Sequence, residues 1–470
     1  MEALKLNEDR LFPADSGTRD VARELYAEVR DLPIISPHGH VSPKLLLDNG
    51  AFADASELFL RWDHYVFRML NAAGVDLETI GVGKVAMTDP RGAWRVLCEN
   101  WRLFDGTASG YWLTHEFVTL FGIDVEPSAE TADAIYDQIG ARLQDADFRP
   151  QALFNAFQIE FMATTDDPLD SLADHEALAR LTASGELGGR VAPTWRPDAY
   201  VNARKPEFRK RVTALTDSIG AAPHDFQGYL KALRESRARF VAAGAVSADY
   251  GVSHPKTLDL DDSEMSRLYQ SCVDGNASAE QMDAFEAGML LRFAGMSLED
   301  GLVMTIHPGV YRNHCSAAFE RFGPDTGHDI PVATEYTRGL QPLLDRYGNE
   351  RDLHLVLFTM DETTYSREIA PLAGYYRSVY IGAPWWFIDA PDSILRFHAA
   401  TTESAGFSRL SGFIDDTRAF LSIPARHDMN RRLDAAFLAR YVREGRLSLT
   451  AAHYWIRRLT VNQPREVFKL

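Results

Sequence analysis

Short apolar runs alternate with longer amphipathic segments along most of the chain. Residues 18–31 carry apolar positions at helical spacing, which predicts a helix, and the apolar run "LPIISPHGH" follows almost at once. The segments between later runs are also helical in pattern, and Ser278 and Gln281 form a capping-box pattern in one of them. Seven later runs are apolar and end in polar or turn residues: "FQIEFMATTDDP", "GRVAPTWRPD", "RFVAAGAVSADYG", "GLVMTIHPGVYRN", "LHLVLFTMDE", "SVYIGAPWWF" and "SGFIDDTR".

This alternation predicts an α/β fold with a parallel sheet. Strands that are apolar along their whole length and alternate with helices pair in parallel and are covered on both faces, and eight such units are the count of a (β/α)8 TIM-type barrel. An open doubly wound sheet is the alternative. It would usually show a glycine-rich phosphate turn, and no GxGxxG or GxxxxGK[ST] motif follows any of these runs. We therefore expect a single barrel domain over residues 1–470.

One long segment departs from the alternation. Residues 44–149 are mostly helical in pattern, rich in aromatic residues and poor in strand signals, as in "AWRVLCENWRLF" and "YWLTHEFVTLFG". The sequence shows no internal repeat, low-complexity run or linker. We expect residues 44–149 to be a helical insertion after the first strand that covers the barrel mouth.

Composition excludes several classes of protein. With 46% hydrophobic and 25% charged residues the profile is that of an ordinary globular chain, and the net charge of −18 argues against nucleic acid or an anionic membrane as partner. The three cysteines lack CxxC spacing, which fits a reducing compartment. The N-terminus has no apolar signal region, and no stretch approaches the roughly 18 apolar residues of a membrane span. We expect a cytoplasmic protein with a small-molecule partner; a homo-oligomer is left open.

The first and last strands end in residues that could bind a metal ion. Catalytic side chains of a barrel gather at the C-terminal strand ends. His38 and His40 end the first run two residues apart, so on a strand they would share a face. Asp415 and Asp416 end the eighth run, which neighbours the first in a closed barrel. Two imidazoles and a carboxylate suit zinc or a similar divalent ion. The alternatives are two loop histidines, and an aspartate that only caps the next helix.

Several segments of the sequence resemble a known protein family. A barrel with His-x-His on strand one and Asp on strand eight resembles the amidohydrolase superfamily, and the finer text resembles the uronate isomerase (glucuronate isomerase) family within it. The similar segments follow the same order over nearly the whole chain: "PIISPHGHVSP", "WDHYVFRML", "ATTDDP", "PTWRPD", "MTIHPGVYRN", "PWWFID" and "GFIDDTRAFLSIPARH".

The resemblance implies roles for residues of the first and eighth strands. It makes His38, His40 and Asp416 the metal ligands and Arg418 a substrate contact. Asp416 and Arg418 are two residues apart, so both would face the pocket if the extended backbone continues to Arg418.

The resemblance also assigns the "DHY" segment of the insertion to the site. His64 and Tyr65 would be acid/base groups, and Arg68 would contact the substrate. If this segment is helical, His64 and Arg68 lie on one face with Tyr65 beside them. The alternative is that all three are ordinary exposed residues on the surface of a helix.

Other strand ends offer candidate substrate contacts. Arg196 and Arg312 could each hold a carboxylate in two parallel hydrogen bonds, or could form structural salt bridges. Trp386 could stack on a sugar ring or belong to the core. His307 ends strand five, where the superfamily often has a histidine. Asp166 and Asp167 precede Pro168, and we expect them to begin a helix rather than to act in catalysis.

One position departs from the family pattern. Strand four of the family ends in an Asp-His pair, and this chain has Asp249 followed by Tyr250. A tyrosine cannot titrate near neutral pH or bind a metal as imidazole does, so the resemblance leaves a proton-relay role at this position in doubt.

The implied activity is an aldose–ketose isomerisation of D-glucuronate, D-galacturonate or both, with proton transfer between C2 and C1. A divalent metal, zinc by the donor set, would be the cofactor, and no organic cofactor is needed because the reaction is internally redox neutral. A metal-dependent hydrolase is one alternative, but strand four offers no lysine near Asp249, and His354 lies at the wrong end of strand six. A non-catalytic sugar-acid binding protein is the alternative from another class.

Overall fold

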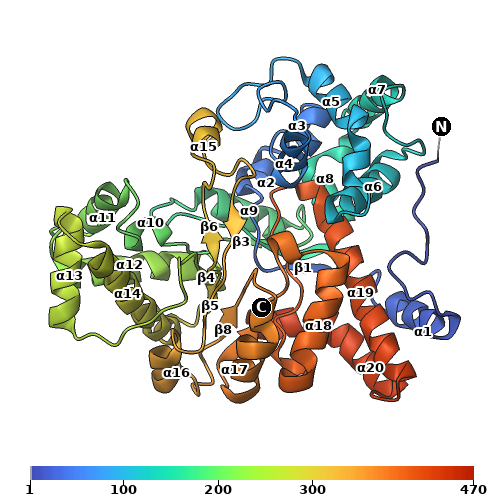
Figure 1. The fold of residues 1–470 in the computed structure, drawn as a ribbon. Coiled ribbons are helices and arrows are strands. Elements are labelled where there is room, and N and C mark those ends of the chain that lie inside the picture. The colour runs from blue at the N-terminus through green and yellow to red at the C-terminus, as the bar shows by residue number, and fades with distance from the viewer. Residues whose placement is uncertain (1–2) are drawn as a thin grey trace.

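Seven short parallel strands lie at the centre of the molecule, with helices around them (Figure 1). The computed structural model describes residues 3–470. The parallel strands are β1 (Ile34–Ser36), β2 (Ile159–Ala163), β3 (Arg190–Ala192), β4 (Ser247–Tyr250), β5 (Val303–Ile306), β8 (Leu355–Leu357) and β9 (Val379–Ile381).

The strands pair in the order in which they follow along the chain. The ladder β1–β2–β3 and the ladder β4–β5–β8–β9 are both parallel. Trp195, which follows β3, bridges Ala248 of β4 and so joins the two ladders. After β9, Leu410 forms a parallel β-bridge with Ile381 of β9. This order is that of a (β/α)8 barrel, as predicted.

The eighth segment is not the regular strand that the apolar run predicts. Gly412 and Asp416 adopt left-handed φ values of 81° and 41°, which interrupt the extended backbone that a ladder requires. The segment meets the first strand region through a hydrogen bond of 2.9 Å from the His40 N–H to the Thr417 carbonyl. The condition that an extended backbone continues to Arg418 is therefore not met.

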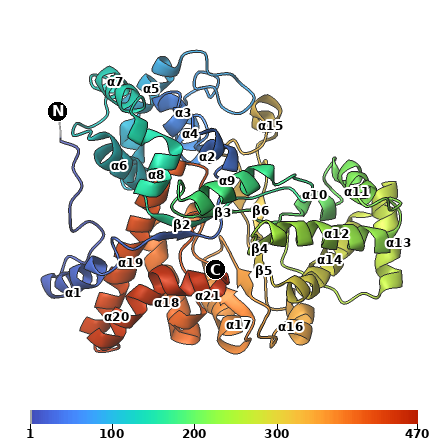
Figure 2. The same ribbon diagram turned by 180° about the vertical axis from the view of Figure 1, so that it is seen from behind.

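Amphipathic helices cover the outside of the strands (Figure 2). The predicted capping box of Ser278 and Gln281 is present at the start of α14, and the helix predicted over residues 18–31 is α1. Apart from α15, which is described below, the α-helices outside the insertion are α1 (Ser16–Ala27), α9 (Ala173–Ser184), α10 (Asp198–Val201), α11 (Phe208–Asp217), α12 (Phe226–Ala242), α13 (Asp262–Asp274), α14 (Ala279–Asp300), α16 (Gln341–Tyr347), α17 (Ala370–Tyr375), α18 (Pro391–Ala405), α19 (Ile423–Arg443), α20 (Leu449–Arg457) and α21 (Gln463–Val467).

A group of helices separates β1 from β2 and stands at one end of the strands in both views (Figures 1 and 2). Its buried side chains, Phe59 and Trp94 among them, form one apolar cluster with Ile34 of β1 and Ile159 of β2. The helices are α2 (Pro43–Asp48), α3 (Ala55–Phe59), α4 (His64–Ala72), α5 (Pro90–Glu99), α6 (Ala108–Phe121), α7 (Ala132–Arg142) and α8 (Pro150–Ala156).

A second excursion follows β5 and was not expected from the sequence. It contains the antiparallel pair β6 (Val310–Tyr311) and β7 (Ile330–Pro331), with α15 (Ser316–Phe322) between them. The excursion contacts the insertion, since the Lys84 N–H donates to the Phe322 carbonyl at 3.0 Å and Arg321 pairs with Glu78 at 2.8 Å.

Candidate active site

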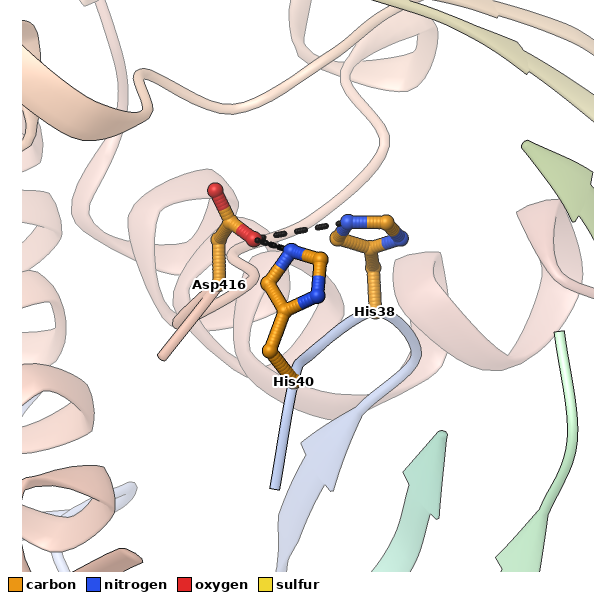
Figure 3. A group of neighbouring side chains, drawn as sticks. All are labelled: His38, His40 and Asp416. Carbon is orange, nitrogen blue, oxygen red and sulfur yellow. Dashed lines mark ion pairs between the residues drawn. The ribbon is translucent and has the colours of Figure 1, made fainter. Parts of the chain in front are cut away.

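His38, His40 and Asp416 come together as the sequence predicts (Figure 3). The Nε2 atoms of His38 and His40 lie 3.4 Å and 3.0 Å from Asp416 Oδ1. That oxygen is buried and has no hydrogen-bond partner among the described residues. Three ligand atoms within 4.8 Å of one another, one of them a buried carboxylate oxygen without a hydrogen bond, fit a divalent metal ion.

Turns rather than strands place these three side chains. β1 ends at Ser36, so the two histidines share a direction because of the turn that follows, not because of strand alternation. Asp416 does not cap a helix either, since α19 begins only after Ser422, which is its N-cap residue. The two histidines therefore do lie in a loop, as the first alternative supposed, but the loop directs both rings at Asp416. The helix-cap alternative for Asp416 lacks support in the geometry.

The electrostatic state of the group suits a cation. Burial raises the pKa of Asp416, but the contacts with His38 and His40 outweigh burial and hold this pKa well below its usual value. Burial lowers the pKa of His40, whereas at His38 the charges of Asp249 and Asp416 outweigh burial and raise the pKa. An ionised carboxylate beside a neutral imidazole is the state in which these groups bind a metal.

A buried ion-pair network lies beside the metal-ligand group at the ends of β4 and β5. His307 Nε2 is 2.8 Å from Asp249 Oδ2, and Arg196 Nη1 is 3.5 Å from the same oxygen. Arg196 also donates from Nε to Asp198 at 2.9 Å. The rings of His307 and His38 are 6.2 Å apart. Asp249 thus orients His307 and Arg196 next to the predicted ligands.

A cavity of about 1740 Å³ opens at these strand ends, between the barrel and the insertion. Such a volume is larger than the roughly 300–1,000 Å³ of typical small-molecule sites, so a single sugar acid fits easily. The predicted site residues that line it are His38, His40, His64, Tyr65, Arg196, His307, Arg312, Trp386, Asp416 and Arg418.

His64 and Tyr65 reach the cavity from the first turn of α4. The Asp63 side chain caps this helix by accepting from the Tyr65 N–H at 2.9 Å, which fixes both residues at its N-terminus. The His64 ring stacks on Tyr65 with centroids 4.4 Å apart and meets Trp386 edge-on at 5.4 Å. Burial lowers the pKa of His64 to about 3 and raises the pKa of Tyr65. His64 is therefore neutral and Tyr65 protonated near neutral pH.

Two of the predicted arginines line the cavity and pair with carboxylates of the excursion after β5. Arg418 Nη2 donates to Asp325 Oδ2 at 3.1 Å, and Arg312 Nη1 donates to Asp329 Oδ2 at 2.8 Å. The Arg312 guanidinium also lies over the Trp386 ring at 4.9 Å. Trp386 thus belongs to the wall of the cavity.

Arg68 does not line the cavity. It follows His64 by one helical turn, as expected, but its guanidinium lies over the Phe387 ring at 4.6 Å. The prediction of a substrate contact for Arg68 lacks support in this arrangement, because packing on the ring turns the side chain aside.

Tyr250, the departure from the family pattern, also points away from the cavity. Its hydroxyl accepts a hydrogen bond from Arg237 of α12 at 2.8 Å, and its ring stacks on Phe293 of α14 at 4.9 Å. The side chain is buried between barrel and helices, whereas Asp249 points toward the metal-ligand group. The tyrosine therefore removes no group from the cavity.

Some polar residues of the site escaped the sequence analysis. Arg426 of α19 is buried, donates to Asp389 at 2.9 Å, and lies 3.6 Å and 5.4 Å from the ring centroids of Trp112 and Tyr65. Asp325, which pairs with Arg418, is another polar residue of the site that the sequence analysis did not identify. The signal available for Arg426 was the charged run "ARHDMNRR" inside a helix whose other residues are mostly apolar.

Asp166 and Asp167 do not begin a helix, contrary to expectation, since α9 starts only at Ala173. Both line the cavity, and burial raises the pKa of Asp166 to about 6. The Thr164 hydroxyl donates to the Asp166 carboxylate at 2.6 Å. Strand-end residues Asp361 and Glu362, in contrast, lie outside the lining.

Comparison with known proteins gives matches over the whole chain. The family model of glucuronate isomerase matches residues 14–468. The uronate isomerase of Corynebacterium efficiens is 50% identical over 463 residues, covering 98% of each chain. The crystal structure of glucuronate isomerase from Caulobacter crescentus superposes with a TM-score of 0.97 at 47% identity, covering 100% of this chain and 98% of that one. Uronate isomerase from Thermotoga maritima gives a TM-score of 0.92 at 27% identity, covering 99% of both chains.

The resemblance inferred from the sequence segments is thus confirmed over residues 14–468. The chain belongs to the glucuronate isomerase family.

Proposed function

We propose that this chain interconverts D-glucuronate and D-fructuronate, D-galacturonate and D-tagaturonate, or both pairs. Membership of the family supports an isomerase. The observation that carries the proposal is the convergence of His38, His40 and Asp416 beside a cavity that also presents arginines. A uronate needs both features, because its carboxylate seeks a guanidinium and its hydroxyl oxygens seek a cation.

We propose zinc as the ion, held by His38, His40 and Asp416, and no organic cofactor. A divalent ion in this position supplies positive charge for the sugar oxygens. The reaction moves hydrogen within one molecule, so no external oxidant or reductant is consumed.

Ring opening requires a group that takes the C1 hydroxyl proton and a group that protonates the ring oxygen. His64 is neutral, with Nε2 buried and without a hydrogen-bond partner among the described residues, so in the tautomer that carries its proton on Nδ1 this atom has a free lone pair for the first task. The protonated hydroxyl of Tyr65 is the donor for the second.

Isomerisation then removes a proton from C2, returns one to C1, and moves the hydroxyl proton from O2 to O1. Asp416, His64 and Tyr65 are the candidates for this transfer. Asp416 Oδ1 faces the two imidazoles, so Oδ2 is the atom that would hold the proton.

The substrate carboxylate is assigned to Arg418 and Arg312, with Arg196 as the third candidate. His307, oriented by Asp249, would donate to or accept from a sugar hydroxyl. Trp386 would pack against an apolar face of the sugar.

Incubation of the purified protein with D-glucuronate in D₂O, followed by NMR, tests the proposal. We expect formation of the keto acid, and loss of turnover in His40→Asn, whereas His314→Gln, an exposed histidine, keeps full activity. Cleavage of model esters without ketose formation would instead indicate a hydrolase, and binding without turnover a sugar-acid binding protein. His354 contacts the Val467 carbonyl, away from the cavity lining, which does not favour the hydrolase.

The organisation of the chain is part of the proposal. We propose one barrel domain over residues 1–470 with residues 44–149 as its insertion, supported by the apolar cluster that the two share. We also propose a cytoplasmic enzyme whose partner is a hexuronate rather than nucleic acid or membrane; size-exclusion chromatography tests for a homo-oligomer. Among the described residues, none of the helices has the length and apolar character to cross a bilayer.

A further inference from the structure

Asp325 presents a carboxylate to the two guanidinium groups that are assigned to the substrate carboxylate. Its Oδ2 accepts from Arg418 Nη2 at 3.1 Å, and its Oδ1 lies 3.9 Å from Arg312 Nη1. The side chains of Arg418 and Asp325 are 41% and 43% exposed, so water and small solutes reach the pair. An ion pair in this position is exchangeable.

The turn that carries Asp325 holds its backbone in place. Gly323, Asp325 and Gly327 have left-handed φ values of 93°, 59° and 84°. A Cβ atom on Gly327 would lie 2.8 Å from Arg68 Cβ of α4, so the turn packs directly on the insertion. The Thr326 hydroxyl donates to the Gly323 carbonyl at 3.0 Å and closes the turn. The carboxylate is therefore presented by a packed turn and not by a free loop.

Asp325 has the same charge as a substrate carboxylate. Burial raises the pKa of Asp325, but the positive charge and hydrogen bond of Arg418 outweigh burial and lower this pKa. The side chain is ionised at neutral pH. It therefore offers Arg418 the interaction that a hexuronate would offer.

We propose that Asp325 is a specificity-determining residue that competes from within the chain for the anion-binding face of Arg418. This inference rests on the proposed function, because the ligand that displaces Asp325 is taken to be a uronate carboxylate. A simple anion that displaced Asp325 would only replace one charged partner of Arg418 with another, so its net binding free energy would be small. A hexuronate gains further contacts through its hydroxyl groups, so only such a ligand displaces Asp325 at low concentration.

The substitution Asp325→Asn tests the inference, since asparagine keeps the size of the side chain and tolerates a left-handed φ. At constant ionic strength we expect the KM for D-glucuronate to fall about threefold and the Ki for inorganic phosphate to fall about tenfold. Glu78→Gln is the matched control. Glu78 pairs with Arg321 at 2.8 Å outside the cavity lining, so neither constant should change in that variant.

A decrease in both constants supports the inference, and an unchanged or increased value of either one overturns it. In an Arg418→Gln background, Asp325→Asn should lower the Ki for phosphate much less, because the closer of the two pairs is already absent and only Arg312, at 3.9 Å, remains beside Asp325. Thermal unfolding confirms that each variant is folded. If the wild type does not turn over hexuronates, the proposed function fails, while calorimetric titration of wild type and Asp325→Asn with phosphate still decides the inference.

Discussion

At the scale of single residues, His64 links the site to the pH dependence of stability. Its pKa in the folded chain is about 3, below the ordinary histidine pKa of 6.5, so the unfolded chain binds a proton more readily. The free energy of unfolding therefore rises with pH between about 3 and 6.5 and is lost as pH falls through this window. Between about pH 7.5 and 5 the free energy of unfolding of the wild type should therefore fall more than that of His64→Gln. We expect a difference of about 1–2 kcal/mol, which allows for the partial exposure of the ring.

Urea unfolding at the two pH values measures this difference. His314→Gln is the control, because His314 is exposed and should leave the wild-type pH dependence intact. Equal pH dependence in His64→Gln and the wild type would show that the folded chain does not keep the His64 imidazole neutral.

Tyr250 gives a second prediction at this scale. Tyr250→Phe removes the hydroxyl that accepts from Arg237 Nη1 at 2.8 Å and leaves a buried donor without its partner. We expect the free energy of unfolding to fall by about 1–3 kcal/mol. The KM for D-glucuronate should stay unchanged, because the side chain faces α12 and α14 rather than the cavity. A changed KM with unchanged stability would contradict this assignment.

The difference between predictable and unpredictable site residues follows from where their partners lie. His38, His40 and an aspartate at position 415 or 416 could be found from the sequence because each ends a recognisable apolar run, and the family resemblance selected Asp416. Asp325 could not, because its role comes from Arg418, which a turn on another strand end brings to it. A local sequence pattern does not predict a contact between two residues that are far apart in the sequence.

At the scale of elements, α19 connects the insertion to the end of the eighth segment. Arg426 donates to the Asp415 carbonyl at 3.2 Å and to Asp389 at 2.9 Å, and its guanidinium lies over Trp112 of α6. Removing one partner of a buried ion pair leaves the other without compensation. We expect Arg426→Leu to cost about 3 kcal/mol of stability and to lower kcat, since Tyr65 packs on the same guanidinium.

Urea unfolding and steady-state kinetics check this prediction. Arg440→Leu on the same helix is the matched control, because its side chain is 46% exposed and should change stability by no more than about 0.5 kcal/mol. A small effect of Arg426→Leu, equal to that of the control, would mean that α19 does not support the site.

Elements with a strong period could be predicted, and irregular ones could not. Seven of the apolar runs contain parallel strands, because continuous burial leaves a clear signal. The eighth run looked the same but is broken by left-handed residues at Gly412 and Asp416, which sequence periodicity does not reveal. The pair β6 and β7 has two residues per strand, too short for any period to appear.

At the scale of the whole molecule, the metal-ligand group ties the two ends of the chain together. His38 and His40 follow β1 near the N-terminus, while Asp416 precedes the last helices. Among the described residues the backbone link between these segments is the hydrogen bond from the His40 N–H to the Thr417 carbonyl. A metal ion bound by all three side chains would therefore reinforce a seam of the barrel that has one backbone hydrogen bond.

Removal of the ion should lower the stability of the entire barrel and not only the activity. A ligand that binds the folded chain alone stabilises it by about 2.7 kcal/mol when its free concentration is one hundred times its Kd. We expect chelator-treated protein to melt at a lower temperature than the zinc-loaded form, and zinc to restore both the melting temperature and turnover. In Asp416→Asn the neutral amide is a poor ligand, so zinc should raise the melting temperature little or not at all. Equal stabilisation of this variant and the wild type by zinc would place the ion elsewhere in the molecule.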